Sequence, residues 1–141
     1  MAMESSAAVV EGLAAFYTAY CSHDPERFAA ALASGDGVSV IGTAPDEGRE
    51  DRESWLAGYA KSIPELGLRL EGGPEPRGYA EGNVGFAVDQ PRFVLPDGGF
   101  VPTRLTAVLR QESEGWKVVH LHFSVGVPDE EAFQAPRLTG D

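Results

Sequence analysis

The sequence has a single cysteine, half as many basic as acidic side chains, and no long apolar run. Cys21 has no partner for an internal disulfide, so the fold must depend on its core. Because no apolar stretch approaches about 20 residues, a membrane-spanning helix is excluded. With 11 Lys and Arg against 22 Asp and Glu, the net charge is −11, which argues against nucleic acid and anionic membranes as partners.

The chain also lacks a recognisable export signal. Residues Met1 to Ser6 have neither the basic start nor the apolar centre of a signal peptide, and a lone cysteine suits a reducing compartment. We therefore expect a cytoplasmic protein. A chain of 141 residues can bury roughly two thirds of the surface that it exposes when unfolded, so residues 1–141 are predicted to form a single domain.

The first half of the chain predicts three helices. Apolar residues recur at helical spacing from Ser5 to Tyr20, after a serine that can cap the first free amides. Asp24 followed by proline begins a short second helix. The third runs from about Asp51 to Ile63 and is predicted to end at Pro64. A brief strand at 37–42 and a polar loop separate the last two helices.

Beyond Pro64 the apolar spacing changes from about 3.6 to about 2 residues, which predicts an antiparallel meander. The strands are expected at 66–71, 84–95, 100–110 and 116–125. Pro91 and Pro102 predict bulges or edge positions within them, and a last helical turn is expected at 128–133. Helices first and antiparallel strands afterwards indicate an α+β domain with helices on one face of the sheet.

The closing strand, from Trp116 to Val125, has the most informative pattern. Alternate side chains of a strand point to opposite faces. One face then carries Val118, His120, His122 and Ser124, and the other carries Val119, Leu121, Phe123 and Val125. The preceding strand alternates in the same way, with Leu105, Ala107 and Leu109 opposite Arg104, Thr106, Val108 and Arg110. Such strands are typical of a sheet that packs helices on one face only.

These features together resemble one protein family. The order of elements and three motifs resemble the SnoaL-like and DUF4440-like branch of the NTF2-like superfamily over nearly the whole chain. The motifs are Trp55-Leu-x-x-Tyr59, Arg104-Leu-Thr106 and Trp116-x-x-Val-His120-x-His122-x-Ser124. The closing strand is also similar to that of the association domain of calcium/calmodulin-dependent kinase II. The resemblance implies an α+β cone in which N-terminal helices pack in a strongly curved antiparallel or mixed sheet around an apolar cavity.

The resemblance also implies a homodimer formed through the outer face of the sheet. The residues predicted at this interface are Thr106, His120, His122 and Ser124. The residues predicted to line the cavity are Phe16, Tyr20, Trp55, Tyr59, Leu121 and Phe123. Protonation of interface histidines would weaken association, so the dimer is expected to be weaker near pH 5 than near pH 8.

The family that this chain resembles includes steroid isomerases of the same fold. The resemblance therefore implies which residues could be catalytic here. These isomerases use a first-helix tyrosine as an oxyanion donor and a carboxylate at the end of the first strand as a base. Tyr17 or Tyr20 could supply the donor. The resemblance places Gly42 where the base would stand, and glycine has no side chain that can accept a proton.

The remaining carboxylate candidates lie elsewhere. Asp46 and Glu47 belong to the loop that follows Gly42, and they could reach over the cavity mouth as an acid or a base. Asp89 on the middle strand is a third candidate, although it could equally pair with Arg92 or Arg104 outside the cavity.

The sequence offers little support for metal or covalent chemistry. His120 and His122 point the same way on a strand and could share a metal, but no third ligand is evident. No serine stands in a strand-to-helix elbow. We therefore expect no metal and no cofactor.

Two classes of function stay open. The first is a module that binds a small organic ligand in an apolar cavity, or that acts by self-association, and the missing base at Gly42 favours it. The second is an isomerase, cyclase or hydrolase-like enzyme that uses a pocket carboxylate and a first-helix tyrosine.

Overall fold

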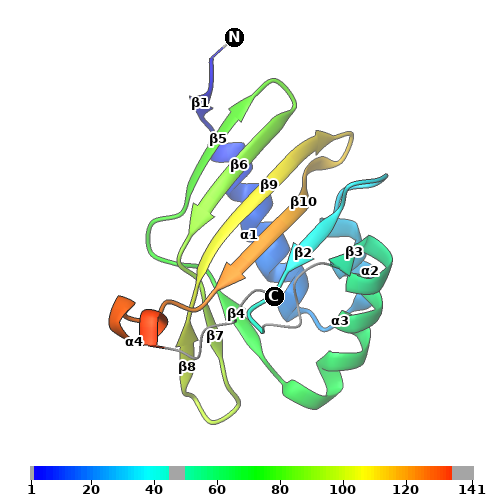
Figure 1. Ribbon diagram of the computed structural model, residues 1–141. Coiled ribbons are helices and arrows are strands. Elements are labelled where there is room, and N and C mark those ends of the chain that lie inside the picture. The colour runs from blue at the N-terminus through cyan, green and yellow to red at the C-terminus, as the bar shows by residue number, and fades with distance from the viewer. Residues whose placement is uncertain (1, 45–49, 135–141) are drawn as a thin grey trace, which may run out of the picture.

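The computed structural model describes residues 2–44 and 50–134 (Figure 1). Three helices lie in the first half of the chain: α1 (Ala7–Cys21), α2 (Pro25–Ala31) and α3 (Arg52–Leu66). Each begins at a polar N-cap whose side chain accepts backbone N–H groups, namely Ser6, Asp24 and Asp51. None of the helices among these residues has both the length and the apolarity to cross a bilayer.

A seven-stranded sheet covers one side of these helices in the order β1-β5-β6-β9-β10-β2-β3. Only the β2–β10 pair is parallel, so the sheet is mixed. Its strands are β1 (Glu4–Ser5), β2 (Ser39–Ile41), β3 (Glu50–Asp51), β5 (Arg77–Glu81), β6 (Val84–Asp89), β9 (Arg104–Glu112) and β10 (Gly115–Ser124). A smaller antiparallel sheet contains β4 (Arg69–Glu71), β7 (Arg92–Val94) and β8 (Phe100–Pro102).

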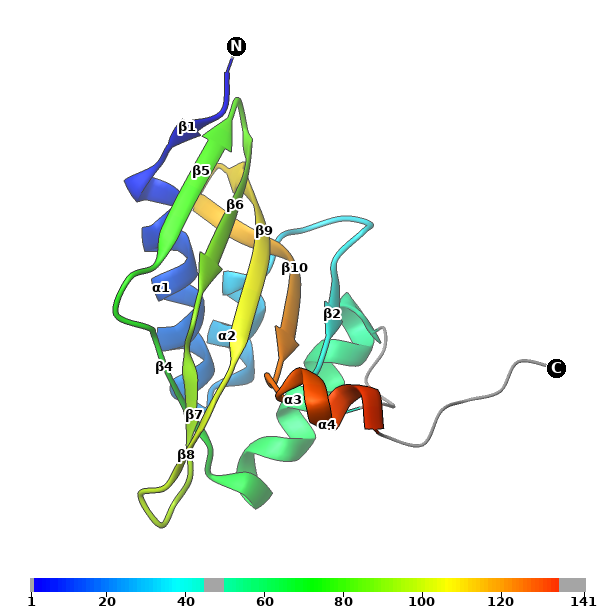
Figure 2. The same ribbon diagram turned by 60° about the vertical axis from the view of Figure 1, so that its left-hand side comes forward.

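The core lies between α1 and the large sheet, which confirms the predicted α+β cone. Val9, Leu13 and Phe16 of α1 are almost fully buried, and burial of each such side chain contributes about 1.5–3 kcal/mol. The predicted alternation of β9 is confirmed, because Leu105, Ala107 and Leu109 are buried whereas Arg104, Thr106, Val108 and Arg110 are exposed or half-buried. Figure 2 shows α1 on one side of the sheet and the short α4 (Asp129–Gln134) on the other.

The two prolines divide the long strands of the predicted meander. Pro91 separates β6 from β7, and Pro102 is the last residue of β8, so each strand passes from the large sheet into the small one. A proline has no N–H to continue a ladder. Thr103 secures the bend instead, because its backbone N–H and its hydroxyl both donate to the Pro91 carbonyl, at 3.0 and 2.7 Å. The bends place the β7–β8 hairpin at the lower end of the molecule in Figure 1.

A bulge in β10 corrects the prediction for Val118. The register shifts between Val118 and His120, so the strict alternation expected from the sequence is broken there. Val118 pairs with Leu109 and is fully buried, whereas the sequence placed it on the polar face. Beyond the bulge, Leu121 and Phe123 are buried and His120, His122 and Ser124 lie on the opposite, outer face.

Helix α3 extends further than predicted. It continues through Pro64 to Leu66 and ends at Gly67, whose φ of 55° is in the left-handed region that glycine adopts readily. The glycine C-cap, and not the proline, therefore terminates the helix.

Candidate functional site

The candidate site is a cavity of about 520 Å³ at the end of the cone where the small sheet meets α3. The end of α1, the end of β2, one side of α3, the β7–β8 hairpin and the end of β10 all contribute side chains. The lining residues are Tyr20, Val40, Gly42, Thr43, Trp55, Gly58, Tyr59, Ser62, Leu68, Phe93, Leu95, Val101, Phe123 and Val125. Most of this surface is apolar, and its polar side-chain groups are hydroxyls and the indole N–H of Trp55.

Aromatic rings form a connected wall around the cavity. The Tyr20 ring lies 5.5 Å from Tyr59 and 6.2 Å from Phe93, and Phe93 lies 5.3 Å from Phe123. Behind this wall, the buried Phe28 ring stacks on Tyr59 with centroids 3.8 Å apart. Contacts of this kind hold each ring in place. The wall can therefore offer fixed ring faces to a flat ligand.

The Tyr59 hydroxyl belongs to the wall and not to the ligand surface. It donates to the carbonyl of Tyr20 at 2.6 Å and lies 3.2 Å from that of Ala19, both at the end of α1. Burial raises the pKa of Tyr59, so the group stays protonated as a donor. Because its hydrogen goes to α1, Tyr59 fastens α3 to the first helix.

Two residues predicted to line the cavity do not do so. Tyr20, Trp55, Tyr59 and Phe123 are lining residues, but Phe16 and Leu121 lie deeper, in the core under α1. Phe16 is one helical turn before Tyr20, and Leu121 is two residues before Phe123 on the same strand. Phe16 supports the cavity from behind, since its ring lies 5.9 Å from that of Trp55, and Leu121 is fully buried in the core.

The β7–β8 hairpin contributes to the cavity, which the sequence pattern did not reveal. Phe93, Leu95 and Val101 line the cavity together with Leu68, which precedes β4. Phe93 and Leu95 are two residues apart, as expected for one face of a strand. That spacing indicates a shared strand face, but it does not show that the hairpin folds back over the end of α1.

The proposed catalytic residues Tyr17 and Asp89 contact each other outside the cavity. The Tyr17 hydroxyl donates to Asp89 Oδ2 at 2.8 Å, and the carboxylate also accepts the backbone N–H groups of Gly73 at 3.0 Å and Gln90 at 2.8 Å. Burial, and then the hydrogen bond and charge of Asp89, raise the pKa of Tyr17 well above its ordinary value. The pair thus joins α1 to the end of β6.

Neither arginine considered as a partner of Asp89 pairs with it. Arg92 pairs with Glu71 at 2.9 Å, and Arg104 donates to the hydroxyl of Ser124 at 3.2 Å. Three internal donors occupy the Asp89 carboxylate, and Asp89 does not line the cavity. The alternative of an ion pair with Arg92 or Arg104 is therefore wrong.

The remaining carboxylate candidates, Asp46 and Glu47, lie outside the described residues. Gly42, the position that the resemblance assigns to a base, lines the cavity. Within residues 2–44 and 50–134 the lining contains no carboxylate, imidazole, amine or guanidinium. The described part of the cavity therefore supplies apolar contact and hydroxyls, and no strong acid or base.

The outer face carries the histidine row. His120 Nδ1 and Ser39 Oγ are hydrogen-bonded at 2.8 Å, whereas His122 is exposed opposite Thr106 of β9. No set of three metal-ligating side chains gathers anywhere in the described ranges. A second hollow of about 460 Å³ opens beside His122, and its lining residues are Pro74, Glu75, Arg77, Val88, Asp89, Gln90, Arg104, Leu105, Thr106, His122 and Ser124.

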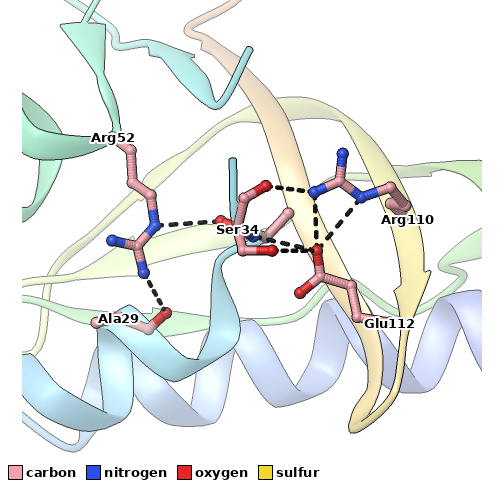
Figure 3. A network of polar contacts seen from close by, with 6 residues as sticks. Ala29, Ser34, Arg52, Arg110 and Glu112 are labelled. Carbon is pink, nitrogen blue, oxygen red and sulfur yellow. Dashed lines mark hydrogen bonds and ion pairs between the residues drawn. The ribbon is translucent and has the colours of Figure 1, made fainter. Parts of the chain in front are cut away.

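A polar network ties α2 to the sheet away from both hollows (Figure 3). The Ser34 N–H and hydroxyl donate to Glu112 at 3.1 and 3.0 Å, and Arg110 donates to Glu112 at 2.8 Å and to the Ser34 carbonyl. Arg110 and Ser34 hold the pKa of Glu112 below its ordinary value. On the other side, Arg52 donates to the carbonyls of Ala33 and Ala29. These bonds fix the segment that follows α2 and have a structural role.

The comparison with protein families identifies the domain. The family model of the SnoaL-like domain matches residues 9–128. The chain belongs to this SnoaL-like family. This assignment, together with structural neighbours of NTF2-like and cystatin-like fold, confirms membership of the NTF2-like superfamily. No curated protein matches the sequence.

Solved structures share the fold of this SnoaL-like domain at low sequence identity. An NTF2-like protein of unknown function from Pseudomonas putida KT2440 is 16% identical, with a TM-score of 0.73 and 91% of this chain and 94% of that chain covered. A candidate dehydratase of the NTF2-like family from Streptomyces avermitilis is 19% identical, with a TM-score of 0.71 and coverages of 85% and 95%.

A third neighbour is of the class of domain that the closing strand resembles. It is a candidate calcium/calmodulin-dependent protein kinase type II association domain from Thiobacillus denitrificans, 19% identical, with a TM-score of 0.66 and coverages of 82% and 93%. At these identities the neighbours show the fold of the SnoaL-like domain and leave its ligand to be argued from the cavity.

Proposed function

We propose that this SnoaL-like domain binds a small, flat and largely apolar organic molecule in the inner cavity. The observation that carries the proposal is the lining, in which five aromatic side chains surround a space of about 520 Å³. They are Tyr20, Trp55, Tyr59, Phe93 and Phe123. Ligand sites of proteins commonly enclose about 300–1,000 Å³ and combine apolar walls with a few polar groups. Thr43 and Ser62 supply such groups here.

Binding is favoured over catalysis by the chemistry of the described lining. Proton transfer needs a group that can hold the proton near neutral pH, within hydrogen-bond reach of the substrate. Gly42 offers none at the position that the resemblance assigns to the base. An isomerase- or cyclase-type enzyme is the alternative, and it requires Asp46 or Glu47, which follow the lining residue Thr43 closely in the chain.

We also propose that two copies associate through the outer face of the large sheet. Support comes from exposed apolar side chains on that face, because Val84 and Val88 of β6 are 48% and 36% exposed. Val88 pairs with Thr106, which pairs in turn with His122. An apolar strand beside a row of hydrogen-bonding groups is the composition expected of a subunit interface.

Ligand binding can be tested with neutral two- and three-ring aromatic probes such as 2-naphthol and anthraquinone. Calorimetry and thermal shift should show binding to the wild-type chain. Val101→Trp, which fills the cavity from β8, should abolish it. Phe100→Trp is the matched control, since Phe100 is the adjacent residue and is 54% exposed. Equal binding by both variants, or no binding by the wild type, would contradict the proposal.

The same probes separate binding from catalysis. Turnover of a bound compound that is lost in Asp46→Asn or Glu47→Gln, while its binding is retained, would establish the enzyme alternative. Binding without turnover in all three chains is the result that the proposal predicts.

A further inference from the structure

Helix α4 is a short, acidic and exposed segment. Asp129, Glu130 and Glu131 occupy its first turn, and all six of its residues are exposed, including Phe133 at 72%. No described element packs against it, and Figure 2 shows it standing out from the side of the sheet opposite α1. Isolated helices shorter than about 12 residues are marginal in water. Among residues 2–44 and 50–134, no other element stabilises this six-residue helix by packing against it.

The hollow of about 460 Å³ on the same side of the molecule is rich in donors. Register places Arg77, Val88, Thr106 and His122 in one row across β5, β6, β9 and β10, and Arg104 opposite Ser124 in the next. Neither Arg77 nor Arg104 takes part in an ion pair with any described residue. Two arginines without a carboxylate partner are unexpected where acids outnumber bases by 22 to 11.

The two carboxylates at the hollow, Asp89 and Glu75, form no ion pair with Arg77 or Arg104. The Asp89 carboxylate is directed to the core, where Tyr17 and two backbone N–H groups occupy it. Glu75 also lines the hollow and forms no ion pair with another described residue. The guanidinium groups, with the side chains of Thr106, Ser124 and His122 near them, therefore offer several donors to an incoming carboxylate.

We propose that the acidic first turn of α4 in one copy docks into the Arg77–Arg104 hollow of a second copy, and the reverse. The proposal rests on the association through the outer face proposed above and adds the contact that fixes the partner. Helix and hollow lie on the same side of the molecule, so a two-fold axis can satisfy both contacts at once. Each copy has a net charge of −11, and the docked charges offset the repulsion between copies.

Two charge-reversed chains test this contact by sedimentation velocity in low salt. In the hollow-reversed chain, Arg77→Glu and Arg104→Glu make both sites negative. In the helix-reversed chain, Glu130→Arg and Glu131→Arg make both positive. Each chain alone should associate at least about tenfold more weakly than wild type. An equimolar mixture should form a heterodimer, because every helix then meets a hollow of opposite charge.

The helix-reversed chain separates local docking from overall charge. Its net negative charge is smaller than that of wild type, so long-range repulsion alone predicts tighter self-association, whereas docking predicts weaker self-association. Lys61→Glu with Arg69→Glu is the matched control for the hollow-reversed chain, since both residues are exposed and lie outside the hollow. This control should associate like wild type.

The outcomes distinguish this contact from the sheet-face dimer. If both reversed chains self-associate as wild type does, the α4 contact is wrong and the sheet-face dimer stands. If wild type stays monomeric at every concentration, both are wrong. If only the hollow-reversed chain loses association, the hollow has another occupant and the α4 contact is again overturned.

Discussion

The inner cavity and the outer sheet face differ although β10 contributes to both. On the inner side, Phe123 joins an aromatic wall whose described lining has no carboxylate, imidazole or cation. On the outer side, His122 and Ser124 stand beside arginines and exposed valines. A cavity of the first kind selects ligands by shape and apolar contact, whereas a surface of the second kind selects partners by charge. One strand thus separates the proposed ligand site from the proposed subunit interface.

The largest expected effect concerns stability on the two sides of β10. Leu121→Ala should lower the free energy of unfolding by about 3 kcal/mol, because it removes a fully buried side chain next to α1. His122→Ala, at the adjacent exposed position, should change it by less than about 0.5 kcal/mol. Urea unfolding of both variants, at a concentration where the chain is monomeric, measures the contrast. Similar losses would contradict the division of β10 into a packed inner side and an exposed outer side.

The boundary of the inner region is tested by Tyr17. Tyr17→Phe should lower stability by about 2 kcal/mol, since the buried Asp89 carboxylate loses a donor. Binding of aromatic probes should be unchanged, because Tyr17 does not line the cavity. Calorimetry alongside urea unfolding checks both expectations. Loss of probe binding in a variant that stays as stable as wild type would return Tyr17 to the functional site.

A pH effect should follow from the same hydroxyl. The pKa of Tyr17 is raised in the folded chain, so between its ordinary value near 10 and its folded value the unfolded chain binds fewer protons than the folded one. The free energy of unfolding should therefore fall above about pH 10. Comparing the free energy of unfolding of wild type and Tyr17→Phe between pH 8 and 11 isolates this contribution. The same pH dependence in both proteins would show that Tyr17 does not cause the effect.

The smallest predicted effect distinguishes two interpretations of the outer face. If the acidic turn of α4 docks beside Arg77 and Arg104, replacing Arg77 with glutamine should weaken association by about threefold, the size expected of an exposed charge pair. An interface formed by the histidine row without that helix predicts no change. Sedimentation of Arg77→Gln, with Lys61→Gln as the control, decides between them.

Local chemistry made much of the fold predictable from the sequence. Ser6, Asp24 and Asp51 cap the three helices, and the alternation of β9 sorts its side chains correctly. The errors also have local causes. The bulge that buries Val118 depends on pairing with β9, and periodicity within one strand cannot reveal a partner's register. Pro64 was assigned as a stop, although Gly67 supplies the C-cap.

The candidate site was harder to predict because its residues meet only in the folded chain. The Tyr17–Asp89 contact joins positions 72 residues apart. The sequence around either residue does not indicate that the two side chains bind each other. The aromatic residues Tyr20, Trp55 and Tyr59 were found because they share helix faces and family motifs. Phe93 and Val101 were missed, since their place at the cavity depends on how the β7–β8 hairpin bends at Pro91 and Pro102.

Ligand binding in the inner cavity can be observed in a crystal structure of the wild-type chain with the aromatic probe that stabilises it most. We expect a ring system enclosed between Trp55, Phe93 and Phe123, with its polar substituent near Thr43 or Ser62. A probe found only on the outer face, with an empty inner cavity, would contradict this expectation.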